Sequence, residues 1–176
     1  SFMYTIEQPP PVVPPTGIYA GTSGGLSFSA DGGLSFVNRT TTDGLGSDSV
    51  NGVFVTSEAV YAATSGGLSI STDGGETFTN RTTDDGLASN DLQALFVSGS
   101  TVYAATDNGL SVSSDGGNSF TTVPDTSGLD ALNIKDVHAE GFVLYVAAFH
   151  SGFGLYVSDE GGDSFIKRTE AGHGFY

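Results

Sequence analysis

Apolar and polar residues alternate over short stretches of the chain, and segments rich in Gly, Asp, Ser and Asn separate these stretches. In residues 67–73, Leu68 and Ile70 point to one face of an extended chain, and the serines between them point to the other. The Val, Phe, Tyr and Thr that favour a half-buried pleated surface are concentrated in three neighbouring segments, 50–56, 59–64 and 76–82. These segments predict four short antiparallel strands joined by tight turns.

The strand pattern recurs along the chain with a period of 42 residues. Similar blocks open at Tyr19, Tyr61, Tyr103 and Tyr145, and the fourth block carries three extra residues within 147–155. A period in the low forties with four short strands per unit is typical of propeller blades. A solenoid is less suitable, because the units contain no helical stretch and no leucine ladder. We therefore predict an all-β propeller of four repeats, each a four-stranded antiparallel blade, in either a small closed ring or half of a larger one.

The first sixteen residues differ from the repeats. Residues 1–16 contain "QPPPVVPP", which predicts a proline-rich linker that also takes the place of the first blade's inner strand, and residues 17–176 hold the four blades. Proline cannot donate to a strand ladder, so this strand is expected to be weak or irregular. Open propeller edges would then be available for pairing. The alternatives are closure by four blades, a homodimer of two chains in an eight-bladed ring, or a fragment of a longer propeller.

Each unit repeats a serine–aspartate–glycine turn between its third and fourth strands. In the second unit we expect Gly74 and Gly75 to adopt positive φ, with Ser71 and Asp73 accepting backbone N–H bonds and Phe78 returning to the core. The last unit has Glu in place of Asp. The corresponding residues in the four units are Ser29, Asp31, Gly33 and Phe36; Ser71, Asp73, Gly75 and Phe78; Ser113, Asp115, Gly117 and Phe120; and Ser158, Glu160, Gly162 and Phe165.

This turn resembles the Asp-box, or bacterial neuraminidase repeat, S-x-D-x-G-x-x-[W/F]. The resemblance covers about residues 17–169, and the loops "DGLGSDSV" and "DGLASNDL" are similar to an element of propeller repeats in sensor-kinase ectodomains. Asp-box repeats occur in sialidases, sortilin-type receptors, some glycoside hydrolases and photosystem II assembly factors. The resemblance implies that the turn is a structural fastener on the blade rim, away from the ligand-binding face, so it leaves the function open.

Charge and composition exclude several partners. The formal net charge is −15 with only five basic residues, so phosphate backbones and anionic membrane surfaces would repel the chain. No apolar run approaches the roughly 18 residues that span a bilayer, so we predict no membrane insertion. The chain has no cysteine. An acidic, cysteine-free propeller behind a linker is consistent with a secreted, cell-surface or periplasmic protein of bacterial origin.

An enzyme is not the expected function. A sialidase needs an arginine cluster, but Arg39, Arg81 and Arg168 occupy equivalent outer-strand positions that point around the rim, and Val123 fills the place in the third unit. We interpret these arginines as solvated or as pairing neighbouring blades. Other glycosidases need two convergent carboxylates, whereas most acidic residues here fall in predicted turns. A sialidase-like glycoside hydrolase, or a propeller fragment of one, remains the alternative.

Metal binding is not predicted either. The histidines at 138, 150 and 173 form no spaced pair, and no EF-hand loop is present. Calcium is the one cation that the loops suggest, through Asp43, Asp84, Asp85 and Asp159. Solvated turn carboxylates are the favoured interpretation of these residues.

The fourth unit departs from the repeat, and departures that the scaffold does not explain mark a candidate site. Phe149, His150 and Phe153 lie in an insertion, "FHSGF", between the second and third strands of this unit. Lys135 and His138 stand where the other units have apolar or neutral residues. We predict a ligand-binding lip that recognises a glycan or, second, a protein partner. The alternative is that the last blade varies because it closes the ring.

Overall fold

The computed structural model describes residues 17–124, 127–129, 133–149 and 153–168. These residues form four antiparallel sheets, each following the chain order of its strands. Sheet 1 contains β1 (Ile18–Thr22), β2 (Gly25–Ser29) and β3 (Val37–Arg39); sheet 2 contains β4 (Val50–Val55), β5 (Val60–Thr64), β6 (Gly67–Ser71) and β7 (Thr79–Arg81); sheet 3 contains β8 (Leu92–Ser98), β9 (Thr101–Thr106), β10 (Gly109–Ser113) and β11 (Thr121–Thr122); sheet 4 contains β12 (Asn133–Glu140), β13 (Val143–Phe149), β14 (Phe153–Ser158) and β15 (Ile166–Arg168).

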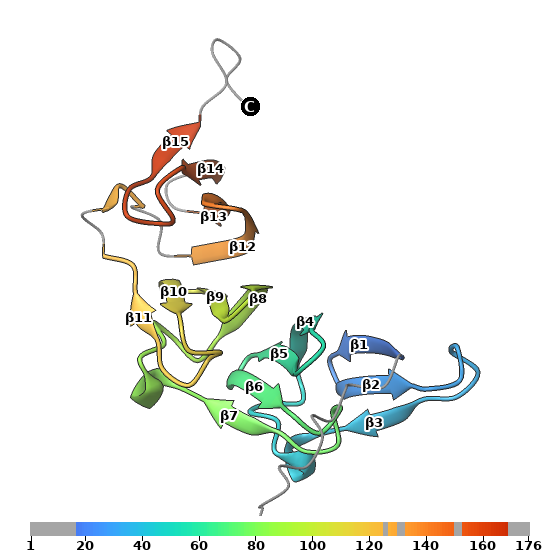
Figure 1. Cartoon of the computed structure of the whole chain (residues 1–176). Helices are drawn as coiled ribbons and strands as arrows, with labels where there is room; N and C mark the ends of the chain where they lie inside the picture. The colour runs from blue at the N-terminus through green and yellow to red at the C-terminus, as the bar shows by residue number, and fades with distance from the viewer. Residues whose placement is uncertain (1–16, 125–126, 130–132, 150–152, 169–176) are drawn as a thin grey trace, which may run out of the picture.

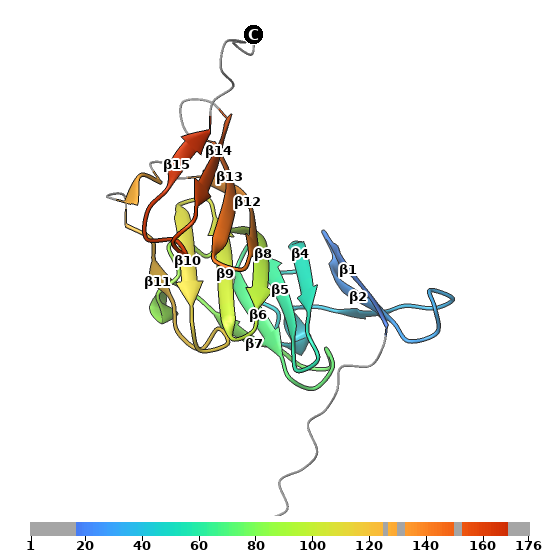
Figure 2. The same cartoon turned by 45° about the horizontal axis from the view of Figure 1, so that its top comes forward.

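The sheets stand one after another around an open arc, with sheet 1 and sheet 4 at its two ends (Figures 1 and 2). The inner strands β4, β8 and β12 line the concave side of this arc, and β7 and β11 lie on its outer side (Figure 1). The all-β architecture of propeller blades is therefore as the sequence predicted. The described residues form an open arc and not a small closed ring, which was one of the two predicted arrangements (Figure 1).

One strand prediction needs correction. The outer strand expected over 76–82 is shorter, because the N–H groups of Glu76 and Thr77 bind the Asp73 carboxylate and leave only Thr79–Arg81 for the ladder. Sheet 1 has three strands within the described residues. The inner strand predicted within residues 1–16 lies outside the described residues.

The core consists of three layers between successive sheets. Each sheet has a forward face, which packs on the next sheet, and a backward face, which packs on the preceding one. Between sheets 2 and 3, the forward residues Tyr61 and Leu68 meet the backward residues Val102, Ala104 and Phe120. Leu68 and Val102 are fully buried, and burying such a side chain contributes about 1.5–3 kcal/mol. Packing of alternate residues thus joins the sheets into one body.

Candidate functional site

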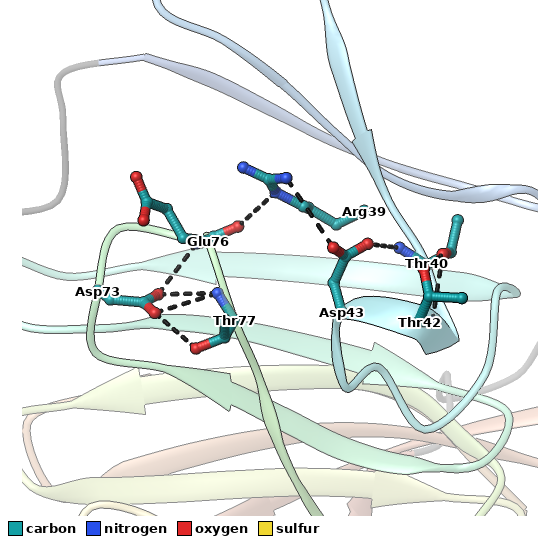
Figure 3. Close-up of polar contacts among 8 residues, drawn as sticks. Arg39, Thr40, Thr42, Asp43, Asp73, Glu76 and Thr77 are labelled. Atoms are coloured by element: carbon teal, nitrogen blue, oxygen red, sulfur yellow. Dashed lines mark hydrogen bonds and ion pairs between the residues drawn. The ribbon is translucent and has the colours of Figure 1, made fainter.

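The repeated turn is a compact hydrogen-bonded unit. In sheet 2, Ser71 Oγ donates to Asp73 Oδ1 over 2.6 Å and accepts from Gly75 N over 2.8 Å. The Asp73 carboxylate also accepts from Glu76 N and from the backbone N and Oγ1 of Thr77 (Figure 3). Burial raises the pKa of Asp73, but the bonds from Ser71 and Thr77 together outweigh it and lower the pKa to about 2.

The other turns vary on this arrangement. Hydrogen bonds from Ser35 and Ser119 hold the pKa values of Asp31 and Asp115 well below their usual range. At the fourth turn, the Glu160 carboxylate accepts a bond from Ser164 Oγ over 3.1 Å. The first three carboxylates are therefore anions held by several donors each, which suits a structural role.

The turns also join one sheet to the next. Arg39 Nε donates to the Gly75 carbonyl over 3.1 Å (Figure 3). Phe78 N donates to the Asp43 carbonyl over 2.9 Å. Asp43 itself caps the short helix η1 (Thr41–Asp43), where Oδ2 accepts from Thr40 N. This helix is therefore part of the junction between sheets 1 and 2.

The same contacts recur one repeat later. Arg81 Nε donates to the Gly117 carbonyl over 3.1 Å, and Phe120 N donates to the Asp85 carbonyl at the end of η2 (Thr83–Asp85). Arg39 and Arg81 thus pair neighbouring blades, which is one of the two roles expected for them, and they do not converge on one pocket. Valine at position 123 removes this contact from the third junction.

One member of the turn set differs from expectation. Phe78, Phe120 and Phe165 are 8%, 8% and 6% exposed, as core anchors should be, whereas Phe36 is 51% exposed. The phenylalanine packs on the sheet that precedes its own, and no sheet precedes sheet 1 among the described residues. The prediction that Phe36 returns to the core is therefore wrong for the arc alone.

The inner strands carry a row of polar side chains on the concave side. Each of β4, β8 and β12 has a β-bulge, and the extra residues are Asn51, Gln93 and Lys135. A bulge redirects the side chain of its extra residue. Asn51 Nδ2 donates to the carbonyl of Leu92 over 2.7 Å, and Lys135 Nζ donates to Gln93 Oε1 over 3.4 Å. We call these three residues the bulge row.

A second row of rings runs beside the bulge row. The rings of Phe54 and Phe96 lie 5.3 Å apart, and those of Phe96 and His138 lie 4.6 Å apart, in both cases edge to face. Tyr145 is 6.5 Å beyond His138. Edge-to-face contacts are favourable for aromatic rings. We call Phe54, Phe96 and His138 the ring row, and they occupy equivalent positions of β4, β8 and β12.

The predicted blade-four residues are only partly brought together. Phe149 and Phe153 are paired in the backbone register at the end of the β13–β14 hairpin, and Phe149 is also paired with Asn133, two residues from Lys135. Phe149 is 45% exposed. His138 instead belongs to the ring row. His150 lies outside the described residues, and so does the middle of the insertion.

The sequence argument missed the partners of Lys135 and His138 in sheets 2 and 3. Asn51 and Gln93 precede Lys135 by two repeat periods and one, and the same offsets relate Phe54 and Phe96 to His138. The period that identifies the blades therefore also identifies both rows, whereas departures from the repeat mark only the members of these rows in sheet 4.

A groove between sheets 2 and 3 is the other hollow of interest. It has a volume of about 600 Å³ and is lined by residues that include Glu58, Tyr61, Ser100 and Asp115. The Asp115 carboxylate already accepts hydrogen bonds from Ser113, Ser119 and Asn118 N. The Asp115 carboxylate of this groove is thus already bound by donors of its own turn.

Within the residues that the structure describes, no three His, Asp or Glu side chains gather in a way that could hold a metal ion. Neither of the two short helices in the described ranges is long and apolar enough to cross a membrane. Asp43 and Asp85, considered for calcium, cap η1 and η2.

No protein-family model matches the sequence, and no curated protein matches it. Several solved structures are similar to the chain. The chain is similar to an ancestral GH74 enzyme, with a TM-score of 0.69 at 16% identity over 92% of this chain and 25% of that one. It is also similar to the extracellular domain of BT4673 from B. thetaiotaomicron, with a TM-score of 0.72 at 18% identity over 90% of this chain and 21% of that one.

A third similar structure is YCF48 bound to D1 peptide, with a TM-score of 0.65 at 13% identity over 92% of this chain and 56% of that one. The chain spans about a quarter or less of the first two proteins and about half of the third. These likenesses concern the fold. The four sheets match blades of larger β-propeller proteins.

Proposed function

We propose that this chain is a non-catalytic recognition module that works outside the cytoplasm and binds its ligand across the concave inner strands. The observation that carries the proposal is the pair of rows that crosses from sheet to sheet there. At the sheet 4 end, Lys135 and His138 replace the residues of the repeat and are exposed. The extracellular domain of BT4673, which has the same fold, supports the location.

The chemistry of the rows favours a glycan. Amide and ammonium groups in the bulge row can bond hydroxyl groups, and ring faces can cover the apolar face of a sugar. Ligand sites typically combine a few well-placed polar groups with aromatic surface.

A protein segment is the second candidate. YCF48, a protein of the same fold, is bound to D1 peptide in its structure. An extended peptide has amide groups that Asn51 and Gln93 can pair with, and its side chains can contact the rings. The formal charge of −15 disfavours nucleic acids and acidic peptides among such partners.

The carboxylates support a non-catalytic role. A general acid of a glycosidase needs a raised pKa, whereas the shifted carboxylates in the described ranges, Asp31, Asp73 and Asp115, all shift downward. Their donors hold them in the turns and leave little freedom for proton transfer. The likeness to a GH74 enzyme keeps a glycoside hydrolase, or a fragment of one, as the alternative function.

A glycan array and a peptide array, probed with the purified chain, test this proposal. We expect the chain to bind selected glycans on the array. The Phe149→Ala variant and the double variant Phe149→Ala with Phe153→Ala should bind them more weakly, while their circular dichroism spectra stay unchanged. Selective signals on the peptide array alone would move the ligand class to proteins. Turnover of aryl-glycosides that stops when one acidic residue is neutralised would overturn the non-catalytic assignment.

A further inference from the structure

The two ends of the arc expose apolar faces that are buried at every junction inside the chain. On the backward face of sheet 1, Ile18 is 46% exposed, whereas the equivalent Val60, Val102 and Leu144 are fully buried. On the forward face of sheet 4, Leu155 is 43% exposed, whereas the equivalent Leu26, Leu68 and Leu110 are fully buried. Each end therefore presents one half of an interface that the chain forms internally.

The hydrogen-bonding groups at the two ends also match. At the junction of sheets 1 and 2, Tyr19 Oη donates to the Gly74 carbonyl and Arg39 Nε donates to the Gly75 carbonyl. At the junction of sheets 2 and 3, Tyr61 and Arg81 donate to Gly116 and Gly117 in the same way. Sheet 3 has Val123 in place of this arginine, but sheet 4 has an arginine again. Arg168 is paired in register with Leu155, as Arg81 is with Leu68.

Sheet 1 holds the acceptors that these donors need. Gly32 and Gly33 form its turn, with φ values of 74° and 92°, close to the 81° and 89° of Gly74 and Gly75. A Cβ added to Gly75 would meet Tyr19 of the preceding sheet at 3.2 Å. Among the described residues, one added to Gly33 would meet only Ile18 and Phe36 of its own sheet within 4 Å. The turn is formed, but no sheet among the described residues covers it.

We propose that the forward face of sheet 4 binds the backward face of sheet 1 of a second copy of this chain, head to tail. In this contact Arg168 donates to the Gly33 carbonyl and Tyr145 donates to that of Gly32, while Phe36 is buried as its equivalents are. The occupant is a second copy because the junctions between the chain's own sheets provide the template, and both halves of that template are exposed.

Two such contacts close a ring of two copies. A head-to-tail interface either closes into a ring or continues as a filament, and the curved arc of the four sheets favours closure (Figure 1). The ring would place the bulge and ring rows of both copies around one central channel. This inference does not depend on what the channel binds.

Sedimentation of the 176-residue chain over a range of concentrations tests the proposal. The salt should be about 0.15 M, which screens surface charge beyond about 8 Å. We expect a single species of twice the 17.9 kDa chain mass. A monomer at every concentration up to about 100 μM would overturn the proposal, and so would a series of ever larger species.

Matched variants identify the faces. Leu155→Asp and Ile18→Asp change exposed residues, so each chain should stay folded by circular dichroism and be monomeric. Mixing these two variants should give a one-to-one dimer, because one intact sheet 4 face meets one intact sheet 1 face. Val37→Asp, on the other face of sheet 1 and 53% exposed, is the control and should leave the dimer intact. A dimer that survives Leu155→Asp contradicts the head-to-tail contact.

Arg168→Ala tests the polar contact separately. A hydrogen bond to a charged group is worth about 1.5 kcal/mol or more, or roughly tenfold in affinity. Because the ring contains two such contacts, the dissociation constant of the dimer should rise by about 100-fold. An unchanged dissociation constant would exclude Arg168 from the interface.

Discussion

Replacement of Asp73 by alanine tests the structural role of the turn. The Asp73 carboxylate accepts from Ser71 Oγ, Glu76 N, Thr77 N and Thr77 Oγ1 over 2.5–3.0 Å. The matched control is Glu160→Ala at the fourth turn, where the carboxylate accepts from Ser164 Oγ over 3.1 Å. The two substitutions remove an acidic side chain from equivalent positions that differ in the bonds they make.

The number of bonds sets the expected difference. A typical hydrogen bond contributes about 0.5–1.5 kcal/mol net, and water competes for partly exposed groups, so about 0.5 kcal/mol per bond is appropriate here. Asp73→Ala should therefore lower the free energy of unfolding by about 2 kcal/mol, and Glu160→Ala by about 0.5 kcal/mol.

Urea unfolding at pH 7, followed by far-ultraviolet circular dichroism, measures both values. The wild-type chain, Asp73→Ala and Glu160→Ala should be compared in one buffer and at one concentration, since association also stabilises the folded state. Equal losses in the two variants, or a loss below about 0.5 kcal/mol for Asp73→Ala, would refute the argument from hydrogen-bond number.

Three further outcomes follow from the same contacts. Because the pKa of Asp73 is about 2, below its ordinary 3.8, its contribution to stability should be present above about pH 4 and lost as the pH falls toward 2, and unfolding curves of Asp73→Asn should lack this part of the acid dependence. Glu160→Asp should stabilise the chain by about 1 kcal/mol in urea, by allowing the bonds of the other turns, and no gain would mean that the fourth turn cannot adopt their geometry. Arg81→Met should cost about 1 kcal/mol by loss of the bond to the Gly117 carbonyl, and an unchanged urea midpoint would show that this inter-sheet bond is replaced by water.

Much of the fold could be predicted from the sequence, because a 42-residue period fixes equivalent positions before any contact is known. The alternation of Leu68 and Ile70 with serines identified a strand, and Gly74 and Gly75 identified a turn with positive φ. Both features are local. The exposure of Phe36 could not be predicted in this way, since it depends on which sheet lies beside its own.

The sequence predicts less of the candidate site than of the fold. Lys135 and His138 were noticed because they break the repeat, but their contacts run to Gln93 and Phe96 in another sheet. The β-bulges that redirect Asn51, Gln93 and Lys135 have no clear signature in single strands, because they depend on pairing with the neighbouring strand. Structure was needed to show that these side chains form rows.

Binding by a variant that restores the repeat tests the central claim most directly. Lys135→Gln with His138→Phe gives sheet 4 the residues that sheet 3 carries at the same positions, Gln93 and Phe96, so the fold should be preserved. Titration calorimetry should be done with the strongest array hit on the wild-type chain and on this variant. We expect affinity to fall at least tenfold, the equivalent of about 1.4 kcal/mol. Unchanged affinity in a folded variant would contradict recognition by the inner strands of sheet 4.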